Sequence, residues 1–566
     1  MFDHRLFWTE SQCLKHGGWL LLLLTALLYL PGTDVIPLMD RDEPRFAQAT
    51  VEMMERGSWA VPYFNGEYRF DKPPLTYWWM QLHYLLFGVG EMGARLHGIA
   101  AVFLTALVTR GLAQRVSGSA RTGFIAGLLW LTTAQVLIHG RLCVADMPMI
   151  LCVTLACRSL IELVVMPLEK PRARWWWTLW LALGFGFLAK GPIAWFVPAM
   201  TLILWRFVFW KKPVSWKHLG VFRGLVLMTL PVAAWGIPAL IETNGLFWEI
   251  GIGRHVVKRG VEVLNGRKFI PGYYLLSTWL SLFPWLFFAV PVWRLLKTQW
   301  SADKAFLTAW FVAPQIIFSF YATQLPHYVM PGYPAFLILL SLVWSSELQL
   351  PKLASWGLLT LGGVIFLVSL SAWAIPIALP ELNSLVHSAA VLLTVMFTVG
   401  GGAALFAWKR NGRVRWWMPL TAMVAFALAL LNFSHQVRET SVTLQVSKIL
   451  KAQPREARLF SQGYDEPSLV FYTQHPWEMG VSMASLRKRL ARPGPCCVVL
   501  LRREWALNGW IESVLGQKQI HLPAKDRTVE VDAQCGAFPD MTRIVVEGFN
   551  GARSSWTEVV ILIRRT

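Results

Sequence analysis

The sequence lacks several patterns that mark common soluble and metal-binding classes. It contains no CxxC or HExxH motif, which argues against the most familiar zinc sites. It shows no internal repeat and no low-complexity segment, so a solenoid or a propeller is disfavoured. Charged residues make up only 15% of the chain, whereas 55% of the residues are hydrophobic. Soluble domains are rarely so apolar, and the composition indicates a membrane protein.

Hydrophobic runs suited to crossing a bilayer, which takes roughly 20 apolar residues per helix, recur from the N-terminus to about residue 432. The first run lacks a small-residue cleavage site and is followed directly by Pro31-Gly32, so we expect a retained span. Residues 175–210 must hold two helices, and all runs together predict about 13 spans. Apart from 175–210, the cores of the runs, the first included, are 20–30, 99–108, 124–137, 147–163, 225–241, 273–292, 337–344, 356–377, 389–407 and 417–431.

The formal net charge of +20 is distributed in a way that argues against nucleic-acid binding. Basic residues cluster in every second loop, which is the positive-inside signature of cytoplasmic loops. With about 13 spans, the N-terminus is then cytoplasmic and the C-terminus external. The basic loops contain Arg110, Arg115 and Arg121, then Lys170, Arg172 and Arg174, then Lys211, Lys212 and Lys217, then Arg294, Lys297 and Lys304, then Lys409, Arg410, Arg413 and Arg415.

The chain changes character at residue 434, where a mixed and moderately polar sequence begins. Residues 442–450 predict an amphipathic helix, and 497–501, 544–547 and 559–563 predict strands. We therefore expect a membrane domain over 1–433 and a periplasmic α/β domain over 434–566. An oxidising compartment there permits a disulfide between Cys535 and either Cys496 or Cys497.

The first external loop, 33–95, concentrates ionisable residues. It contains Asp42-Glu43 directly before Pro44, and later Asp71-Lys72-Pro73-Pro74. Apolar residues near the first pair recur at helical spacing, which predicts a short amphipathic helix along the membrane.

Other external loops add further polar residues near apolar sequence. Asp146 begins a span, and Lys190 lies between two apolar runs. Lysine and arginine can hold a phosphate through charge-assisted hydrogen bonds. A carboxylate can accept a proton or stabilise positive charge at an anomeric carbon. Because ionisable groups at membrane depth are expensive, this pattern indicates a site for group transfer from a lipid phosphate.

The same segments resemble a known family. DEPRFA, GSWAVPYFNG, DKPPLTYW, RLCVADMPMI, FLAKGPIA, GRH and QLPHYVMPGYP match, in order, the lipid-linked-sugar glycosyltransferases of the GT-C fold. Within them the chain is similar to the protein O-mannosyltransferase and aminoarabinose (lipid A) transferase branch. The resemblance covers nearly all of the membrane part but only YDEPSLVFY, 464–472, of the tail. It implies a polytopic helical membrane protein whose donor is a polyprenyl-phosphate sugar.

The resemblance also implies residue roles. Asp42 matches the catalytic acidic residue, with Glu43 beside it and Asp146 as a second acidic residue. Lys72 and Lys190 match basic residues near the donor phosphate. No cofactor is required with certainty, and a divalent metal is left open because Asp71 stands where the family usually has Glu. The remaining candidates are Arg254 and Arg259 for the donor phosphate, His255 with Asp71 for the metal, and Arg45, Tyr77, His327 and Tyr328 for the substrate cavity.

Simpler structural interpretations stand beside these roles. Asp42-Glu43 could begin a helix, and Lys190 could extend to the membrane surface from a helix end. The histidines could be interfacial, and Arg254 and Arg259 could contact lipid headgroups.

We predict a monomeric transferase in the bacterial inner membrane. It moves a sugar from undecaprenyl phosphate to an acceptor at the periplasmic face, in contact with membrane lipids. The first choice is transfer of a 4-amino-4-deoxy-L-arabinose-type sugar to lipid A, and another glycan or a protein hydroxyl is the alternative acceptor. A flippase would place its ionisable residues near the membrane midplane. An inactive scaffold would leave the carboxylates and lysines unexplained.

Overall fold

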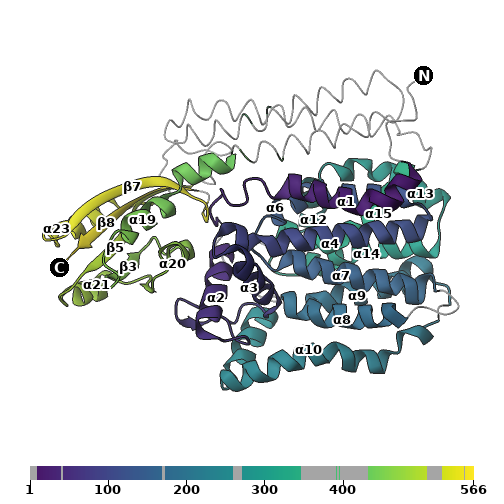
Figure 1. The fold of residues 1–566 in the computed structure, drawn as a ribbon, viewed down its shortest axis with the longest axis horizontal. Helices are drawn as coiled ribbons and strands as arrows, with labels where there is room; N and C mark the ends of the chain where they lie inside the picture. Colours follow the sequence, from purple (N-terminus) through teal and green to yellow (C-terminus); the bar gives the residue numbers. More distant parts are fainter. Residues whose placement is uncertain are drawn as a thin grey trace.

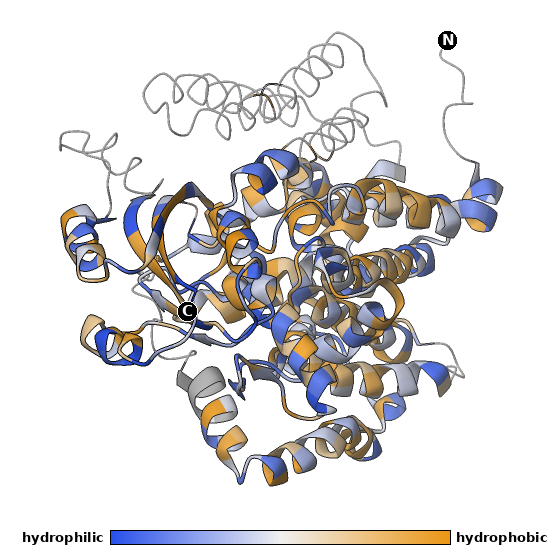
Figure 2. Ribbon diagram, turned by 60° about the vertical axis from the view of Figure 1, so that its left-hand side comes forward, coloured by the Kyte–Doolittle hydropathy of each residue, from blue (hydrophilic) through white to orange (hydrophobic). Residues whose placement is uncertain are grey.

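The computed structural model describes residues 9–39, 42–167, 173–213, 215–258, 270–345, 433–506, 525–553 and 555–565, with the isolated positions 391, 394, 427 and 431. Its helices lie side by side in one body, and a mixed α/β part lies at one end of that body (Figure 1). Hydrophobic residues run along the helices of the body, whereas the α/β part mixes hydrophobic and hydrophilic residues (Figure 2).

Five helices of the described part are long and apolar enough to span a membrane. The prediction of an α-helical polytopic membrane protein is therefore confirmed. The predicted spans at 356–377, 389–407 and 417–431 lie outside the described residues, except for a few positions, so the total of about 13 stays a prediction. The five helices are Glu91–Ser117 (α4), Asp146–Val165 (α7 and η2), Ile193–Trp210 (α9 and η3), Lys217–Glu242 (η4 and α10) and Pro326–Trp344 (η8 and most of α15).

Shorter or less apolar helices pack among these five. As predicted, residues 175–210 hold two helices, because α8 ends before α9 begins. The additional helices are α1 (Glu10–Tyr29), α5 (Ala120–Leu131), α6 (Ala134–His139), α8 (Ala173–Lys190), η5 (Phe247–Lys258), α12 (Tyr273–Ser281), η7 (Trp285–Phe288), α13 (Ala289–Thr298) and α14 (Ala302–Ser319).

Two predicted spans are broken in the structure. The run at 124–137 divides into α5 and α6 at Thr132 and Thr133, whose hydroxyls donate to carbonyls of the preceding turn. The run at 273–292 bends by 104° between α12 and the helices that follow. Pro284 lies at that bend, and proline has no N–H with which to continue a helix.

The two ends of the helical body carry different residues. Arg115 Nε lies 3.1 Å from Glu162 Oε2, and the Arg158 guanidinium lies 4.8 Å from the centre of the Trp175 ring. Asp146 begins α7, the helix in which Arg158 lies near the other end. Arg115, which belongs to a predicted cytoplasmic loop, thus lies at the end opposite to Asp146.

The first loop folds into helix α2 (Asp42–Arg56), a hairpin of β1 (Tyr63–Phe64) and β2 (Glu67–Tyr68), and helix α3 (Leu75–Phe87). The predicted amphipathic helix is present as α2. Its apolar residues pack against α3 and against Phe471 of α20 (Pro467–Thr473) in the α/β part. The apolar face of α2 is therefore covered by protein.

The α/β part is built on a sheet of six strands, in which the predicted strands appear as β5, β7 and β8 and the predicted helix as α19. The strand order is β4-β3-β5-β8-β7, with β6 paired to β5. Strand β3 runs parallel to β4 and β5, whereas β8 is antiparallel to β5 and β7. The elements are α19 (Val442–Lys451), β3 (Arg458–Gln462), β4 (Trp477–Glu478), α21 (Met483–Leu490), β5 (Cys496–Ala506), β6 (Lys525–Asp526), α23 (Thr528–Gly536), β7 (Thr542–Asn550) and β8 (Ser555–Arg564).

Both faces of this sheet are covered, which explains the continuous apolar run in β5. Cys497 and Val499 face α19 and α20, while Cys496 and Val498 face α21 and α23. A strand buried on both faces has no polar side to expose.

The disulfide expected in the tail is absent. All seven cysteines lie in described segments and are free thiols. Cys496 and Cys535 share one apolar layer, whereas Cys497 lies in the opposite layer. Burial raises the pKa of Cys497 to about 12, which keeps it a neutral thiol.

Candidate active site

A cavity of about 370 Å³ lies where the first loop meets the ends of several helices. The loop contributes Asp71 and Lys72, and the end of α7 contributes Asp146. Most of the remaining lining is apolar or aromatic, from Phe70, Met149, Phe187, Ile193, Phe196, Trp235, Phe247, Ile317, Phe318, Tyr321 and Tyr328. The cavity therefore offers a few charged groups within a mainly apolar wall, as ligand sites usually do.

Asp146 and Lys190, which are 44 residues apart, form an ion pair in the cavity wall. Lys190 Nζ lies 2.5 Å from Asp146 Oδ1, and both side chains are largely buried. Lys190 is at this position because α8 ends there: Gly191 takes φ = 78°, a conformation that favours glycine, and Pro192 precedes α9. A cation and a carboxylate thus face the cavity as one coupled unit.

His327 and Tyr328, in the first turn of η8, lie beside the same pair. His327 Nε2 lies 3.9 Å from Asp146 Oδ1, and Lys190 Nζ lies 5.2 Å from the centre of the Tyr328 ring. The His327 ring is also 4.4 Å from the ring of His139 at the end of α6. Four of the residues selected from the sequence, Asp146, Lys190, His327 and Tyr328, therefore meet in space.

A second charged group borders the cavity from the first loop. Arg69 Nη1 lies 3.0 Å from Asp71 Oδ2, and Arg69 Nε donates to the Tyr77 hydroxyl at 3.1 Å. Lys72 Nζ donates to the backbone carbonyl of Asp71 at 3.1 Å. Burial raises the pKa of Tyr77 to about 12, so this phenol is neutral at physiological pH.

Asp42 lies at the exposed start of α2, with 57% of its side chain accessible. Arg45 Nη1 is 4.0 Å from Asp42 Oδ1. Burial lowers the pKa of Arg69, but the neighbouring Tyr77 hydroxyl and the carboxylates of Asp71 and Asp42 outweigh burial, so the pKa of Arg69 is raised. The charge of Asp42 thus influences Arg69, and its carboxylate is accessible, although Asp42 does not itself line the cavity.

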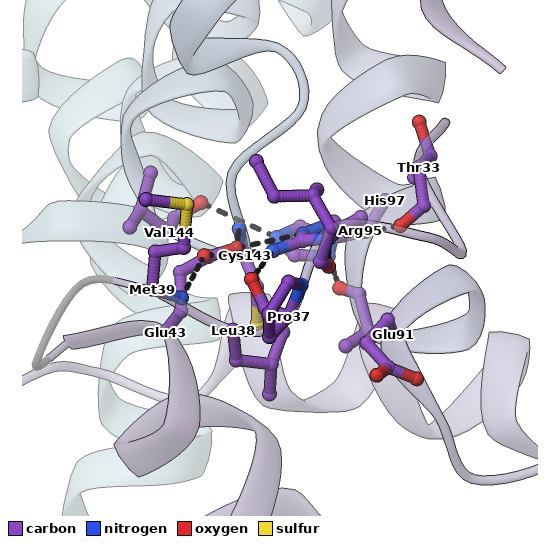
Figure 3. Close-up of polar contacts among 12 residues, drawn as sticks. Thr33, Pro37, Leu38, Met39, Glu43, Glu91, Arg95, His97, Cys143 and Val144 are labelled. Atoms are coloured by element: carbon purple, nitrogen blue, oxygen red, sulfur yellow. Dashed lines mark hydrogen bonds and ion pairs between the residues drawn. The ribbon is translucent and has the colours of Figure 1, made fainter. Parts of the chain in front are cut away.

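Glu43, the neighbour of Asp42, has a different environment (Figure 3). It is fully buried, and its two oxygens accept from Arg95 Nε and Nη2 at 2.9 Å each. The same oxygens accept from the backbone amides of Cys143 and Met39 at 2.8 and 3.1 Å. Arg95 in turn donates to the carbonyls of Thr33, Ile36 and Pro37. Glu43 does not line the cavity, and its contacts hold the first loop onto α4.

The remaining candidates belong to the segment after α10. Arg259 lies outside the described residues, and of Arg254 and His255 only the backbone is described, in η5. Gly251 of the same helix lines the cavity. The roles suggested for Arg254, His255 and Arg259 stay predictions.

Sequence reasoning missed two residues of the site. Arg69 had a signal, because it stands two positions before Asp71 in an aromatic segment. His139 also had a signal in the sequence, because it shortly precedes Asp146. In the structure its Nδ1 lies 2.7 Å from Gln135 Nε2. Neither signal shows that Arg69 lies over Phe46 or that His139 lies against His327.

The arrangement suits an anionic head group attached to an apolar chain. Lys72 and Lys190 supply positive charge at the cavity wall, and the aromatic lining can accept hydrocarbon. Asp42 supplies an exposed carboxylate whose charge influences Arg69. Phosphate binding and group transfer are both chemically feasible here.

Comparisons with known proteins identify sequence relatives of this chain. The family profile of dolichyl-phosphate-mannose-protein mannosyltransferase matches residues 71–235. An undecaprenyl phosphate-alpha-4-amino-4-deoxy-L-arabinose arabinosyl transferase from Pectobacterium atrosepticum is 28% identical over 435 residues, covering 75% of this chain and 76% of that protein. A transferase of the same name from Pseudomonas aeruginosa is 28% identical over 424 residues, covering 72% of this chain and 73% of that protein.

The solved structures establish the fold. ArnT from Cupriavidus metallidurans in the apo state superposes with a TM-score of 0.75 at 20% identity, covering 96% of this chain and 98% of that chain. The same protein bound to undecaprenyl phosphate gives a TM-score of 0.73 with the same coverage. The GT-C fold expected from the sequence is confirmed.

Proposed function

We propose that this chain, an ArnT-like membrane protein of the GT-C fold, transfers a sugar from undecaprenyl phosphate to an acceptor at the periplasmic face of the bacterial inner membrane. The cavity is the observation that carries the proposal, because it joins Lys72, Asp146 and Lys190 to an apolar wall. The names of the relatives favour 4-amino-4-deoxy-L-arabinose as the sugar. The acceptor that we propose is lipid A, as the resemblance of the first loop and of the tail to the aminoarabinose enzymes implies.

The donor phosphate is held by Lys72 and Lys190. Both lysines line the cavity, and an ammonium group binds phosphate oxygens through charge-assisted hydrogen bonds. Lys190 is paired with Asp146 in the structure, so the phosphate competes with that carboxylate for the ammonium. The aromatic wall accommodates the first part of the polyprenyl chain.

The transfer step breaks the bond between the anomeric carbon and the phosphate oxygen. The electron pair leaves with undecaprenyl phosphate, and an acceptor oxygen bonds to the anomeric carbon from the opposite face. Lys72 and Lys190 stabilise the charge that the leaving phosphate gains. With a hydroxyl acceptor, the proton passes to Asp42; with a phosphate acceptor, Asp42 orients it or stabilises the positive centre.

Mass spectrometry of lipid A from a deletion strain tests the proposal. The strain should lose a lipid A species that carries one additional sugar, and wild-type protein should restore it. Asp42→Asn should fail to restore it, while Asp34→Asn, which removes another exposed carboxylate of the same loop, should succeed. If the deletion leaves lipid A and every other glycan unchanged, the proposal is wrong. Loss of a sugar from another glycan would instead identify that glycan as the acceptor.

A further inference from the structure

Arg69 is a buried cation that ties together three segments around the cavity. Its side chain is only 7% exposed. It pairs with Asp71 in the loop, donates to Tyr77 of α3, and lies 5.3 Å from the centre of the Phe46 ring of α2. Phe46 and Tyr77 are themselves in contact, with ring centres 5.1 Å apart. Arg69 therefore links the Asp71-Lys72 segment to α2 and α3.

This contact decides whether Asp71 suits a divalent metal, which the sequence left open. A metal ligand must direct a carboxylate oxygen at the ion, about 2.0–2.2 Å away for zinc. Here Asp71 Oδ2 already faces a guanidinium that carries a permanent positive charge. A divalent ion on this carboxylate would lie within a few ångströms of that charge and be repelled. Among the described residues, no group of three His, Cys, Asp or Glu side chains could hold a metal. Asp71 does not fit a metal ligand.

The charge balance of the loop gives Arg69 a specific task. Lys72 follows Asp71 directly and contacts its carbonyl, so the Asp71 carboxylate lies beside the group that is to bind phosphate. An unpaired carboxylate there would repel the phosphate. Because Arg69 pairs with Asp71, less of the negative charge of that carboxylate opposes a phosphate at Lys72.

We propose that Arg69 is a positioning residue that neutralises Asp71 in place of a divalent cation and presents Lys72 to the donor phosphate. The inference rests on the proposed function, since it concerns the same donor site. It also means that transfer needs no metal ion at Asp71.

The experiment is a double-mutant cycle read by the Kd for undecaprenyl phosphate, measured on full-length protein in detergent. Arg69→Gln should raise Kd at least tenfold, because the Asp71 carboxylate then opposes the phosphate. Asp71→Asn should lower Kd. The double variant Arg69→Gln with Asp71→Asn should have a Kd at least fivefold lower than that of Arg69→Gln alone. Arg69→Lys keeps the charge but cannot make both contacts, so it should fall between wild type and Arg69→Gln.

Two controls make the outcomes decisive. Arg56→Gln removes an arginine of α2 that stacks on Tyr63 and should leave Kd unchanged. Wild-type protein should keep its transfer rate after treatment with a chelator. A double variant as weak as Arg69→Gln would show that Arg69 does not act through Asp71 and would overturn the inference. The inference would also be overturned if a chelator abolished transfer and added zinc or magnesium restored it. If wild-type protein does not bind undecaprenyl phosphate, the proposed function itself fails.

Discussion

Adjacent carboxylates in α2 should respond in opposite ways to the same substitution. Glu43 is fully buried and holds Arg95 through two hydrogen bonds, whereas the Asp42 side chain is 57% exposed and is 4.0 Å from Arg45. Glu43→Gln should therefore destabilise the fold with the loss of a buried partner. Asp42→Asn should preserve the fold and abolish transfer.

The loss of folding free energy expected for Glu43→Gln follows from the hydrogen bonds that Glu43 makes. Glu43→Gln leaves the Arg95 guanidinium buried without a counter-charge and places an amide N–H₂ where an oxygen accepted two hydrogen bonds. Removing one member of a buried pair costs about 3–5 kcal/mol. That loss lowers the ratio of folded to unfolded protein by roughly two to four orders of magnitude. Asp42→Asn loses only an exposed contact, which is worth about 0–1 kcal/mol.

Size-exclusion yield in detergent and thermal unfolding followed by tryptophan fluorescence measure this difference. We expect little monodisperse Glu43→Gln protein and normal yields of Asp42→Asn. Glu43→Leu combined with Arg95→Met removes both charges and should recover part of the stability. A Glu43→Gln protein with wild-type stability and no transfer activity would refute this reasoning, because it would make Glu43 a catalytic residue.

Three further predictions concern the donor site and the tail. Lys72→Ala should weaken binding of undecaprenyl phosphate by roughly 10- to 150-fold, since a hydrogen bond to a charged group is worth about 1.5–3 kcal/mol, and an unchanged Kd in titration would contradict this. Asp146→Asn leaves Lys190 without its carboxylate, so undecaprenyl phosphate should raise the unfolding temperature of this variant more than that of wild type; equal increases would show that the phosphate does not reach Lys190. Asn65→Ala loses reciprocal hydrogen bonds of 2.8 and 2.9 Å with the Trp477 backbone, at about 0.5–1.5 kcal/mol each, and should speed hydrogen exchange in β4 while Asn65→Asp shows a smaller effect; unaltered exchange would mean that the hairpin does not hold the tail.

The sequence predicted the helical membrane architecture because apolar runs and basic loops are local properties. The strands of the tail were predictable for the same reason, since the runs in β5 and β8 are continuously apolar. The breaks at Thr132 and Pro284 were missed, because a hydropathy run does not show where a helix bends. The disulfide expectation was wrong: the tail cysteines are free thiols, and Cys497 faces the layer opposite to Cys535, which its position in the sequence does not show.

The candidate site was predictable in its residue types but not in their pairing. Asp146 and Lys190 were both selected as ionisable residues at helix ends, yet only the packing of α7 on α8 joins them. Asp42 and Glu43 are adjacent, and successive residues of a helix point about 100° apart, so one faces solvent and the other the core. Which one is buried depends on Arg95, 52 residues further along the chain.

Sugar transfer from undecaprenyl phosphate at this cavity can be measured with the purified protein. The protein is placed in liposomes and supplied with undecaprenyl-phosphate-linked aminoarabinose and lipid A. We expect sugar to appear on lipid A and free undecaprenyl phosphate to accumulate in equal amount, with neither product formed by Asp42→Asn. Movement of the donor across the liposome membrane with no transferred sugar would contradict the account and identify the protein as a transporter.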